Sequence, residues 1–148
     1  MKQFRFQLEP VLDYKTQALD ALQVELNTAQ ALVAAQERQV DEARKRLTEY
    51  DADYSQRKQD GMTIIEAMEC ESCRVVLQRR LRQEQEKLRR LEKLAEDKRN
   101  EVVEARKETH SLEKLKEIRK KEYHTALAKA EEKQMDDLTA ARRVAVAG

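Results

Sequence analysis

The chain has 148 residues, enough for one ordinary domain, but its composition is not that of a globular protein. Charged residues make up 40% of it and aromatic residues only 4%, and many of its apolar residues are alanine, so a thick hydrophobic core is not expected. The formal net charge is only +1 and the two signs are interspersed, which argues against a disordered chain. The sequence has no apolar run of about 18 residues, and residues 1–9 lack the apolar stretch of a secretory signal, so we expect a cytoplasmic protein that does not span a membrane.

The few helix-breaking residues predict two helices joined by one turn. Proline is tolerated in the first turn of a helix, so Pro10 places the start of a first helix over about residues 9–58. The dipeptide Asp60-Gly61 is a turn signal, which places the turn at about residues 59–62.

A second, longer helix is predicted after this turn. Thr63 can cap its N-terminus, and Glu66 stands three residues later, as in a capping box. No further breaker occurs before Gly148, so we expect this helix over about residues 63–145. The predicted fold class is therefore all-α: one coiled-coil domain over residues 1–148, a two-helix antiparallel hairpin with a longer second helix.

Heptad spacing of the apolar residues predicts that the two helices pack along one narrow seam. In the first helix every a position is apolar: Leu12, Leu19, Leu26, Val33, Val40, Leu47 and Tyr54. Its d positions are smaller or polar, which predicts a thin seam: Lys15, Leu22, Ala29, Gln36, Ala43 and Tyr50. The matching seam of the second helix is interrupted by Glu84 and Lys98 and fails where Lys116 and Arg119 fall on seam positions; its members are Leu77, Leu81, Leu88, Leu91, Ala95, Val102, Ala105 and Leu112.

Charge favours pairing of these helices within one chain. Residues 1–60 hold 9 basic and 11 acidic side chains, a net charge of −2, whereas residues 74–100 hold 10 basic and 5 acidic ones, a net charge of +5. Opposite signs on the two arms favour an intramolecular hairpin over association of like arms.

The two predicted helices differ in length. At 1.5 Å per residue they would measure about 75 and about 125 Å. Folding about Gly61 places Leu8 opposite about residue 114, and brings Phe4 and Phe6 near residues 112–118. We therefore predict that a C-terminal overhang, about residues 115–148, has no partner in the chain and either frays or docks on another molecule.

No constellation of residues predicts a catalytic, cofactor or metal site. Two glycines cannot form a phosphate-binding loop, and His110 and His124 lie about 21 Å apart along one helix, too far to share a metal ion. Cys70 and Cys73 form a C-x-x-C without a second pair or a nearby histidine, so we interpret them as small buried residues at the end of the seam. Two helices offer no cleft for paired carboxylates, and we expect no enzyme activity.

A basic run in the second helix raises the alternative of nucleic-acid binding. Acidic residues interleave with this run and the acidic first helix could neutralise it, so we favour a solvated or arm-pairing face and expect no nucleic-acid partner. The run consists of Arg79, Arg80, Arg82, Lys87, Arg89 and Arg90.

Three stretches of the sequence together resemble one known family. The N-terminal run from Phe4 to Leu12, FRFQLEPVL, looks like the opening F-x-F-x-L-E-x-V-L of FliJ, the flagellar export stalk family. Tyr50 and Tyr54 resemble its paired tyrosines, and the tail is similar to its closing pattern of E-K, K-x-E-Y and E-x-K-x-x-D-E. Asp137 stands where glutamate is usual in that pattern, which is a mild departure. The resemblance covers nearly the whole chain.

The resemblance implies a non-enzymatic part in the cytoplasmic ATPase complex of flagellar type III protein export, and so in flagellum assembly and motility. Proteins of this family look like the gamma stalk of rotary ATPases. One end would stand in the hexameric export ATPase (FliI) and promote its assembly and activity, and the other would engage the export-gate membrane protein (FlhA). Some members also handle export chaperones. The chain would be cytoplasmic and peripheral to the membrane through its partners. The alternatives are the homologous stalk of a virulence secretion system and a general coiled-coil scaffold or tether.

Two interaction surfaces are predicted, one at the turn and one at the termini. The surface at the turn, expected to bind the export gate, consists of Leu47, Tyr50, Tyr54, Cys73 and Leu77. For the two tyrosines, packing in the seam is an open alternative, because both fit the heptad frame. The surface at the termini, expected to enter the ATPase ring, consists of Phe4, Phe6, Leu8, Tyr123, Leu127, Leu138, Arg142 and Arg143.

Overall fold

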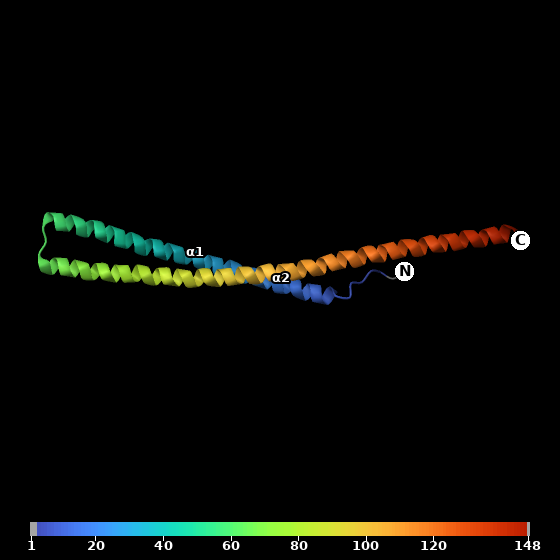
Figure 1. The fold of residues 1–148 in the computed structure, drawn as a ribbon, viewed down its shortest axis with the longest axis horizontal. Helices are drawn as coiled ribbons and strands as arrows, with labels where there is room; N and C mark the ends of the chain where they lie inside the picture. Colours follow the sequence, from blue (N-terminus) through green and yellow to red (C-terminus); the bar gives the residue numbers. More distant parts are fainter. Residues whose placement is uncertain (1–2, 148) are drawn as a thin grey trace. The chain divides into compact units, whose positions relative to one another are not determined.

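The structure is a computed structural model that describes residues 3–147, and within that range it holds two helices and no strand. Helix α1 spans Glu9–Asp60, 52 residues, and helix α2 spans Ile64–Ala147, 84 residues (Figure 1). The helices run antiparallel and pack against each other, which confirms the predicted all-α hairpin with a longer second helix. Gly148, the breaker expected after α2, lies outside the described residues.

The turn between the helices is formed by a glycine and a capping threonine. Gly61 has a φ of 104°, in the left-handed region that glycine enters without a steric penalty. The hydroxyl of Thr63 accepts a hydrogen bond of 3.2 Å from the amide of Glu66, which satisfies one of the unpaired amides at the start of α2. The predicted N-cap of the second helix is therefore present.

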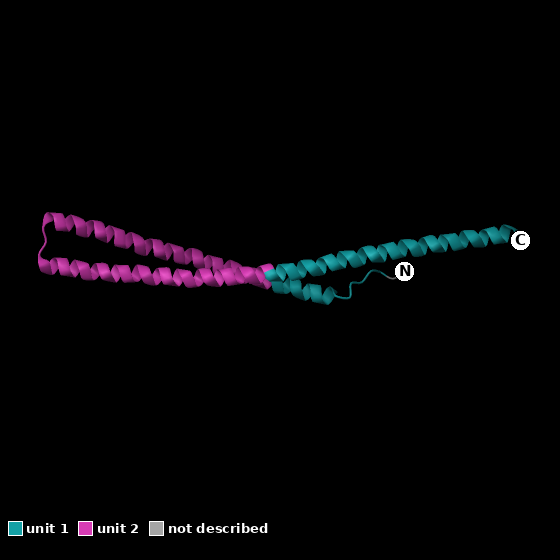
Figure 2. Ribbon diagram, in the orientation of Figure 1, with its two compact units in different colours: residues 1–20, 104–148 teal, residues 21–103 magenta. Residues whose placement is uncertain are grey.

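The chain divides into two compact units, each containing a part of both helices (Figure 2). We call residues 21–103, which include the turn, the hairpin unit. Residues 1–20 together with 104–148 form the terminal unit. That both units belong to one coiled-coil domain stays a prediction.

The seam of the hairpin unit follows the heptad frame. Leu26, Ala29, Val40 and Ala43 of α1 are buried, as is Val102 of α2. The remaining seam positions are at least half-buried, and none is exposed. The exposed residues between them are mostly charged, so each helix buries only a stripe, as the scarcity of large apolar residues predicts.

The terminal unit pairs the first turns of α1 with the middle of α2. Leu12 and Thr109 are buried there, at 7% and 5% exposure. Residues 3–8, before α1, are not helical, and they join the helix through a hydrogen bond of 3.0 Å from the amide of Glu9 to the carbonyl of Phe6. Neither helix has, among the described residues, a stretch long and apolar enough to cross a membrane.

Candidate functional site

A groove in the terminal unit lies between the N-terminal segment, residues 3–8, and α2. Its volume is about 910 Å³. The ring of Phe4 lies 5.7 Å from the ring of Tyr123, with the two planes tilted by 47°, a favourable aromatic arrangement. Phe6 is only 9% exposed, so it anchors the segment. The lining residues are Gln3, Phe4, Arg5, Phe6, Gln7, Leu8, Leu115, Arg119 and Tyr123.

The N-terminal segment reaches further along α2 than the sequence predicts. We expected Phe4 and Phe6 near residues 112–118, but Phe4 lies beside Tyr123. The expectation assumed a helical rise of about 1.5 Å per residue, whereas a non-helical segment advances by up to about 3.3 Å per residue. Tyr123, predicted to lie on the unpartnered tail, is therefore half-covered by the chain's own N-terminus.

The bare part of α2 consequently begins later than residue 115, where the overhang was expected. Leu115 and Leu127 are half-buried, while every residue from 128 to 147 is exposed. Leu138 is 54% exposed, and the two predicted arginines of this stretch, Arg142 and Arg143, are exposed as well. The predicted terminal surface thus falls into an anchored part around Phe6 and a bare helical part beyond residue 127.

Two ion pairs account for polar residues in the seam of the terminal unit. The ammonium of Lys116 lies 2.8 Å from the carboxylate of Glu9, and that of Lys15 lies 2.9 Å from Glu108. The hydrogen bond to Glu108, followed by its negative charge, raises the pKa of Lys15. Because these pairs are part-exposed, they contribute to register more than to stability.

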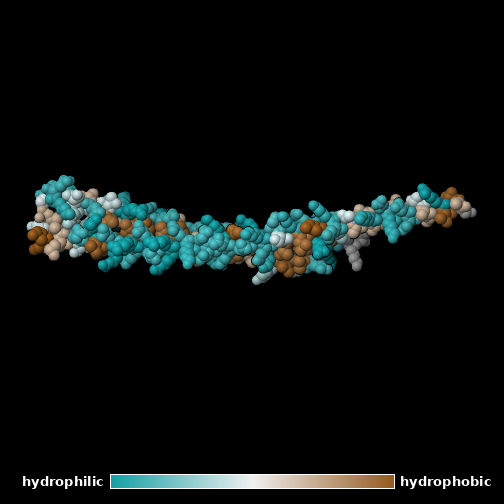
Figure 3. Space-filling model, viewed as in Figure 1, coloured by the Kyte–Doolittle hydropathy of each residue, from teal (hydrophilic) through white to brown (hydrophobic). Residues whose placement is uncertain are grey.

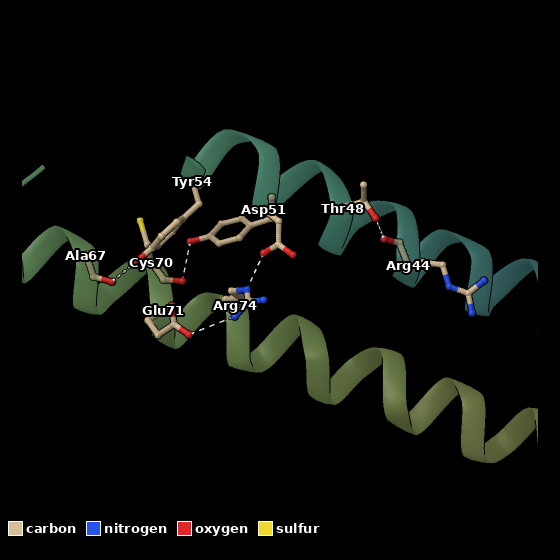
Figure 4. A network of polar contacts seen from close by, with 9 residues as sticks. Arg44, Thr48, Asp51, Tyr54, Ala67, Cys70, Glu71 and Arg74 are labelled. Carbon is tan, nitrogen blue, oxygen red and sulfur yellow. Dashed lines mark hydrogen bonds and ion pairs between the residues drawn. The ribbon is translucent and has the colours of Figure 1, made fainter. Parts of the chain in front are cut away.

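The tyrosines near the turn pack between the helices of the hairpin unit. The hydroxyl of Tyr50 donates a hydrogen bond of 3.1 Å to the carbonyl of Cys70. The hydroxyl of Tyr54 donates one of 3.4 Å to the carbonyl of Ala67 (Figure 4). Tyr54 is 8% exposed, and the ammonium of Lys58 covers its ring at 4.0 Å. Burial, and then hydrogen bonding to Cys70 and Cys73, raise the pKa of Tyr50. These contacts favour seam packing for Tyr54, the alternative left open by the sequence.

The other residues of the predicted surface at the turn are only partly accessible. Leu47 and Leu77 are half-buried in the seam. Cys70 is buried, with its sulfur 3.7 Å from the guanidinium of Arg57, whereas Cys73 is exposed. The expectation that both cysteines are buried is wrong for Cys73, because three positions along a helix is a rotation of about 300°, enough to carry it from the seam to its rim.

Polar residues that interrupt the predicted seam meet across the hairpin unit. The amide of Gln36, a buried side chain, donates to the carbonyl oxygen of Glu84 at 3.0 Å and to its carboxylate. Lys98 lies 3.0 Å from the carboxylate of Glu25. These pairs fix which turn of α1 faces which turn of α2.

The basic run on α2 forms its ion pairs with neighbours in the same helix. Among the described residues, its ion pairs lie within α2: Arg80 with Glu84, and Arg89 and Arg90 with Glu86. The arm-pairing interpretation is therefore wrong for this run, and the solvated interpretation fits it. The ion pair of 2.8 Å that does cross the arms nearby, from Arg74 to Asp51, lies on the preceding turn (Figure 4).

An exposed apolar stripe lies at the start of α2, and the heptad pattern of the sequence does not predict it. Five residues form it, with exposures between 42% and 80%: Ile64, Ile65, Met68, Val75 and Val76. The signal in the sequence is a second set of apolar residues at helical spacing, outside the frame that begins at Leu77.

The comparison with protein families decides the identity of the chain. The family described as "Flagellar FliJ protein" matches residues 4–147. The chain belongs to the FliJ family. No curated protein and no solved structure matched it. The match covers both helices of this FliJ protein and the turn between them, and it confirms the resemblance found in the sequence. The described residues hold no group of three or more side chains arranged to bind a metal ion.

Proposed function

We propose that this FliJ family member is a non-enzymatic stalk of the flagellar type III protein export ATPase complex. The observation that carries the proposal is the family match over residues 4–147, which takes in all of α1 and α2. The flagellar description of that family favours the flagellar apparatus over a virulence secretion system. The protein would act in the cytoplasm, peripheral to the membrane through its partners, and would contribute to flagellum assembly and motility.

The terminal unit is the part that we assign to the hexameric export ATPase (FliI). Every residue of its bare helix, 128–147, is exposed, so apolar and basic side chains there are free to contact a surrounding ring. An isolated charged helix of this length is marginal in water, so a partner that covers it would stabilise it. Anchoring of the N-terminal segment between Phe4 and Tyr123 supports the base of this helix.

The turn of the hairpin unit is the part that we assign to the export gate (FlhA). Cys73 is the exposed member of the predicted surface, with half-buried Tyr50 and Leu77 beside it. Tyr54 would hold the surface in shape rather than bind directly, because it is buried. Export chaperones are a further class of partner that the family suggests.

Stimulation of ATP hydrolysis by the purified export ATPase tests the assignment. The full chain should raise the hydrolysis rate, whereas a chain ending at residue 130 should not, although its N-terminal anchor at Tyr123 is retained. Circular dichroism must show that the truncated chain keeps its remaining helix. Full stimulation by the truncated chain would mean that the bare helix is not the part that enters the ring.

The gate assignment has a separate test. Replacing Cys73 by Glu places a charge on the exposed rim and should weaken binding to the gate by about ten-fold or more, without lowering the melting temperature. The matched control is Ala31→Glu, an added charge at an exposed position of α1 in the same unit. Equal affinity of both variants for the gate would remove Cys73 from the interface.

A further inference from the structure

The face of α2 that points away from α1 continues from the apolar stripe into the basic run. Two positions along a helix correspond to a rotation of about 200°, so a residue two positions before a seam residue lies on the opposite face. Met68 stands in this relation to buried Cys70, Val75 to Leu77, and Arg79 to Leu81. Arg82 and Glu86 have the same relation to Glu84 and Leu88, so one outer face runs from residue 64 to residue 90.

The first half of this outer face is apolar and exposed. Ile64, Ile65 and Met68 are 80%, 71% and 65% exposed, and Val75 and Val76 are 42% and 60% exposed. In Figure 3 hydrophobic surface is visible at the end of the hairpin unit that holds the turn. Exposed apolar side chains gathered on one face of a helix are costly in water and commonly mark a place where another molecule packs.

The second half of the outer face is basic and forms a shallow groove of about 670 Å³. Among the described residues, no carboxylate lies within ion-pairing distance of Arg79, Arg82 or Lys87, while Arg90 shares Glu86 with Arg89. The groove therefore has positive charge left to offer a partner. Its lining consists of Val75, Arg79, Arg82, Gln83, Glu86, Lys87 and Arg90.

From this outer face, with its apolar first half and basic second half, we infer a third interaction surface. It binds an amphipathic helix of another protein, and that helix is apolar at one end and acidic along the rest. The site spans residues 64–90, about 40 Å of helix, and the side chains of a helix face accept those of a second helix between them. This surface is separate from the two assigned above, since neither Cys73 nor the terminal unit contributes to it.

The pattern of charge selects this partner over the other classes. Glu69 and Glu71 flank the apolar half, and they would repel an anionic membrane there. A nucleic acid would leave the apolar half uncovered. A second copy fits poorly, because parallel copies would oppose their arginines and antiparallel copies would set arginines against apolar residues.

The test measures binding of the full chain to designed peptides by fluorescence anisotropy. The probe is a helix of about 27 residues with leucines along one face of its first half and glutamates along its second half; a matched probe carries lysine in place of glutamate. We expect the wild type to bind the acidic probe about ten-fold or more tightly than the basic one. Replacing both Arg79 and Arg82 by Glu should reverse this preference, and replacing Ile65 and Met68 by Gln should weaken binding of both probes.

Two controls separate this outcome from general effects. Replacing Lys120 and Lys121 by Glu makes the same change in net charge on the terminal unit and should leave binding unaltered. Circular dichroism should show equal helix content in all variants. The inference is overturned if the acidic probe does not bind, if the variants bind it as the wild type does, or if duplex DNA, phosphatidylglycerol–phosphatidylcholine vesicles or a second copy of the chain occupies residues 64–90 more tightly.

Discussion

The amide of Gln36 on α1 donates to the carbonyl oxygen of Glu84 on α2 at 3.0 Å, and to the Glu84 carboxylate as well, so two residues that interrupt an apolar seam satisfy each other. Gln36 is 5% exposed, and a buried amide without a partner would be destabilising. Arg80 lies 3.0 Å from the same carboxylate and balances its charge. The pair ties the middle of the hairpin unit to one register.

Removing one member of this pair should cost more than removing both. Glu84→Ala leaves the side chain of Gln36 buried with fewer acceptors, and we expect a loss of about 1–3 kcal/mol in the free energy of unfolding. The double replacement of Gln36 and Glu84 by Leu should be at least as stable as the wild type, because it converts the polar layer to an apolar one. Urea unfolding measures both, with the exposed Gln30→Ala as a control of near-zero effect. A double variant less stable than Glu84→Ala would contradict this account.

Alkaline unfolding should depend on Tyr50. Its pKa is raised in the folded chain, so the unfolded chain releases the phenolic proton first and stability falls as the pH rises above the ordinary value of 10.0. Tyr50→Phe should lose about 1 kcal/mol at neutral pH with its hydrogen bond to Cys70, and its stability should then fall less steeply than that of the wild type above pH 10. The raised pKa values of Lys15 and Lys98 act in both proteins and cancel in the comparison.

Melting temperatures between pH 7 and pH 12 provide the measurement, and Tyr14→Phe, at a tyrosine that is 69% exposed, provides the control. Parallel curves for Tyr50→Phe and the wild type over that range would show that the hydroxyl of Tyr50 faces water.

Anchoring of the N-terminal segment should depend on Phe4 and Phe6. Replacing both by Ala removes the contact with Tyr123 and the buried ring of Phe6, which we expect to weaken docking of the segment by about 2–3 kcal/mol. Trypsin should then cut after Arg5 much faster than in the wild type, because undocking frees the backbone of the non-helical segment that lines the groove. Val11→Ala, at a 42% exposed position of α1, is the matched control. Unchanged cutting after Arg5 would mean that the segment is not docked.

The sequence predicts the fold well because a coiled-coil hairpin is specified by local patterns. The frame of Leu12 and Leu26 continues to buried Tyr54, and Gly61 and Thr63 form the turn and the cap where their residue types predict. The register also follows, since a fixed rise per residue determines which positions oppose each other.

The candidate sites are less predictable from the sequence, because their residues lie in a non-helical segment or outside the heptad frame. The segment before α1 is non-helical, so the position of Phe4 could not be obtained by counting helical turns. The heptad frame identifies only the apolar residues that repeat along one seam. It therefore does not identify Ile65 and Met68, which are exposed on the outer face. The net charge of each arm predicts that the two arms attract each other. It does not predict that Arg79 and Arg82 lie on the face of α2 that points away from α1.

The central claim, that the bare end of α2 enters the export ATPase, is tested most directly by site-specific photo-cross-linking in the assembled complex. A photoreactive residue in place of Leu138, which is 54% exposed, should cross-link to residues lining the pore of the ATPase hexamer. The same residue in place of Ala52, exposed on α1 near the turn, should give no cross-link to the ATPase. Cross-links to the ATPase from position 52 and none from position 138 would contradict the account and place the turn in the ring instead.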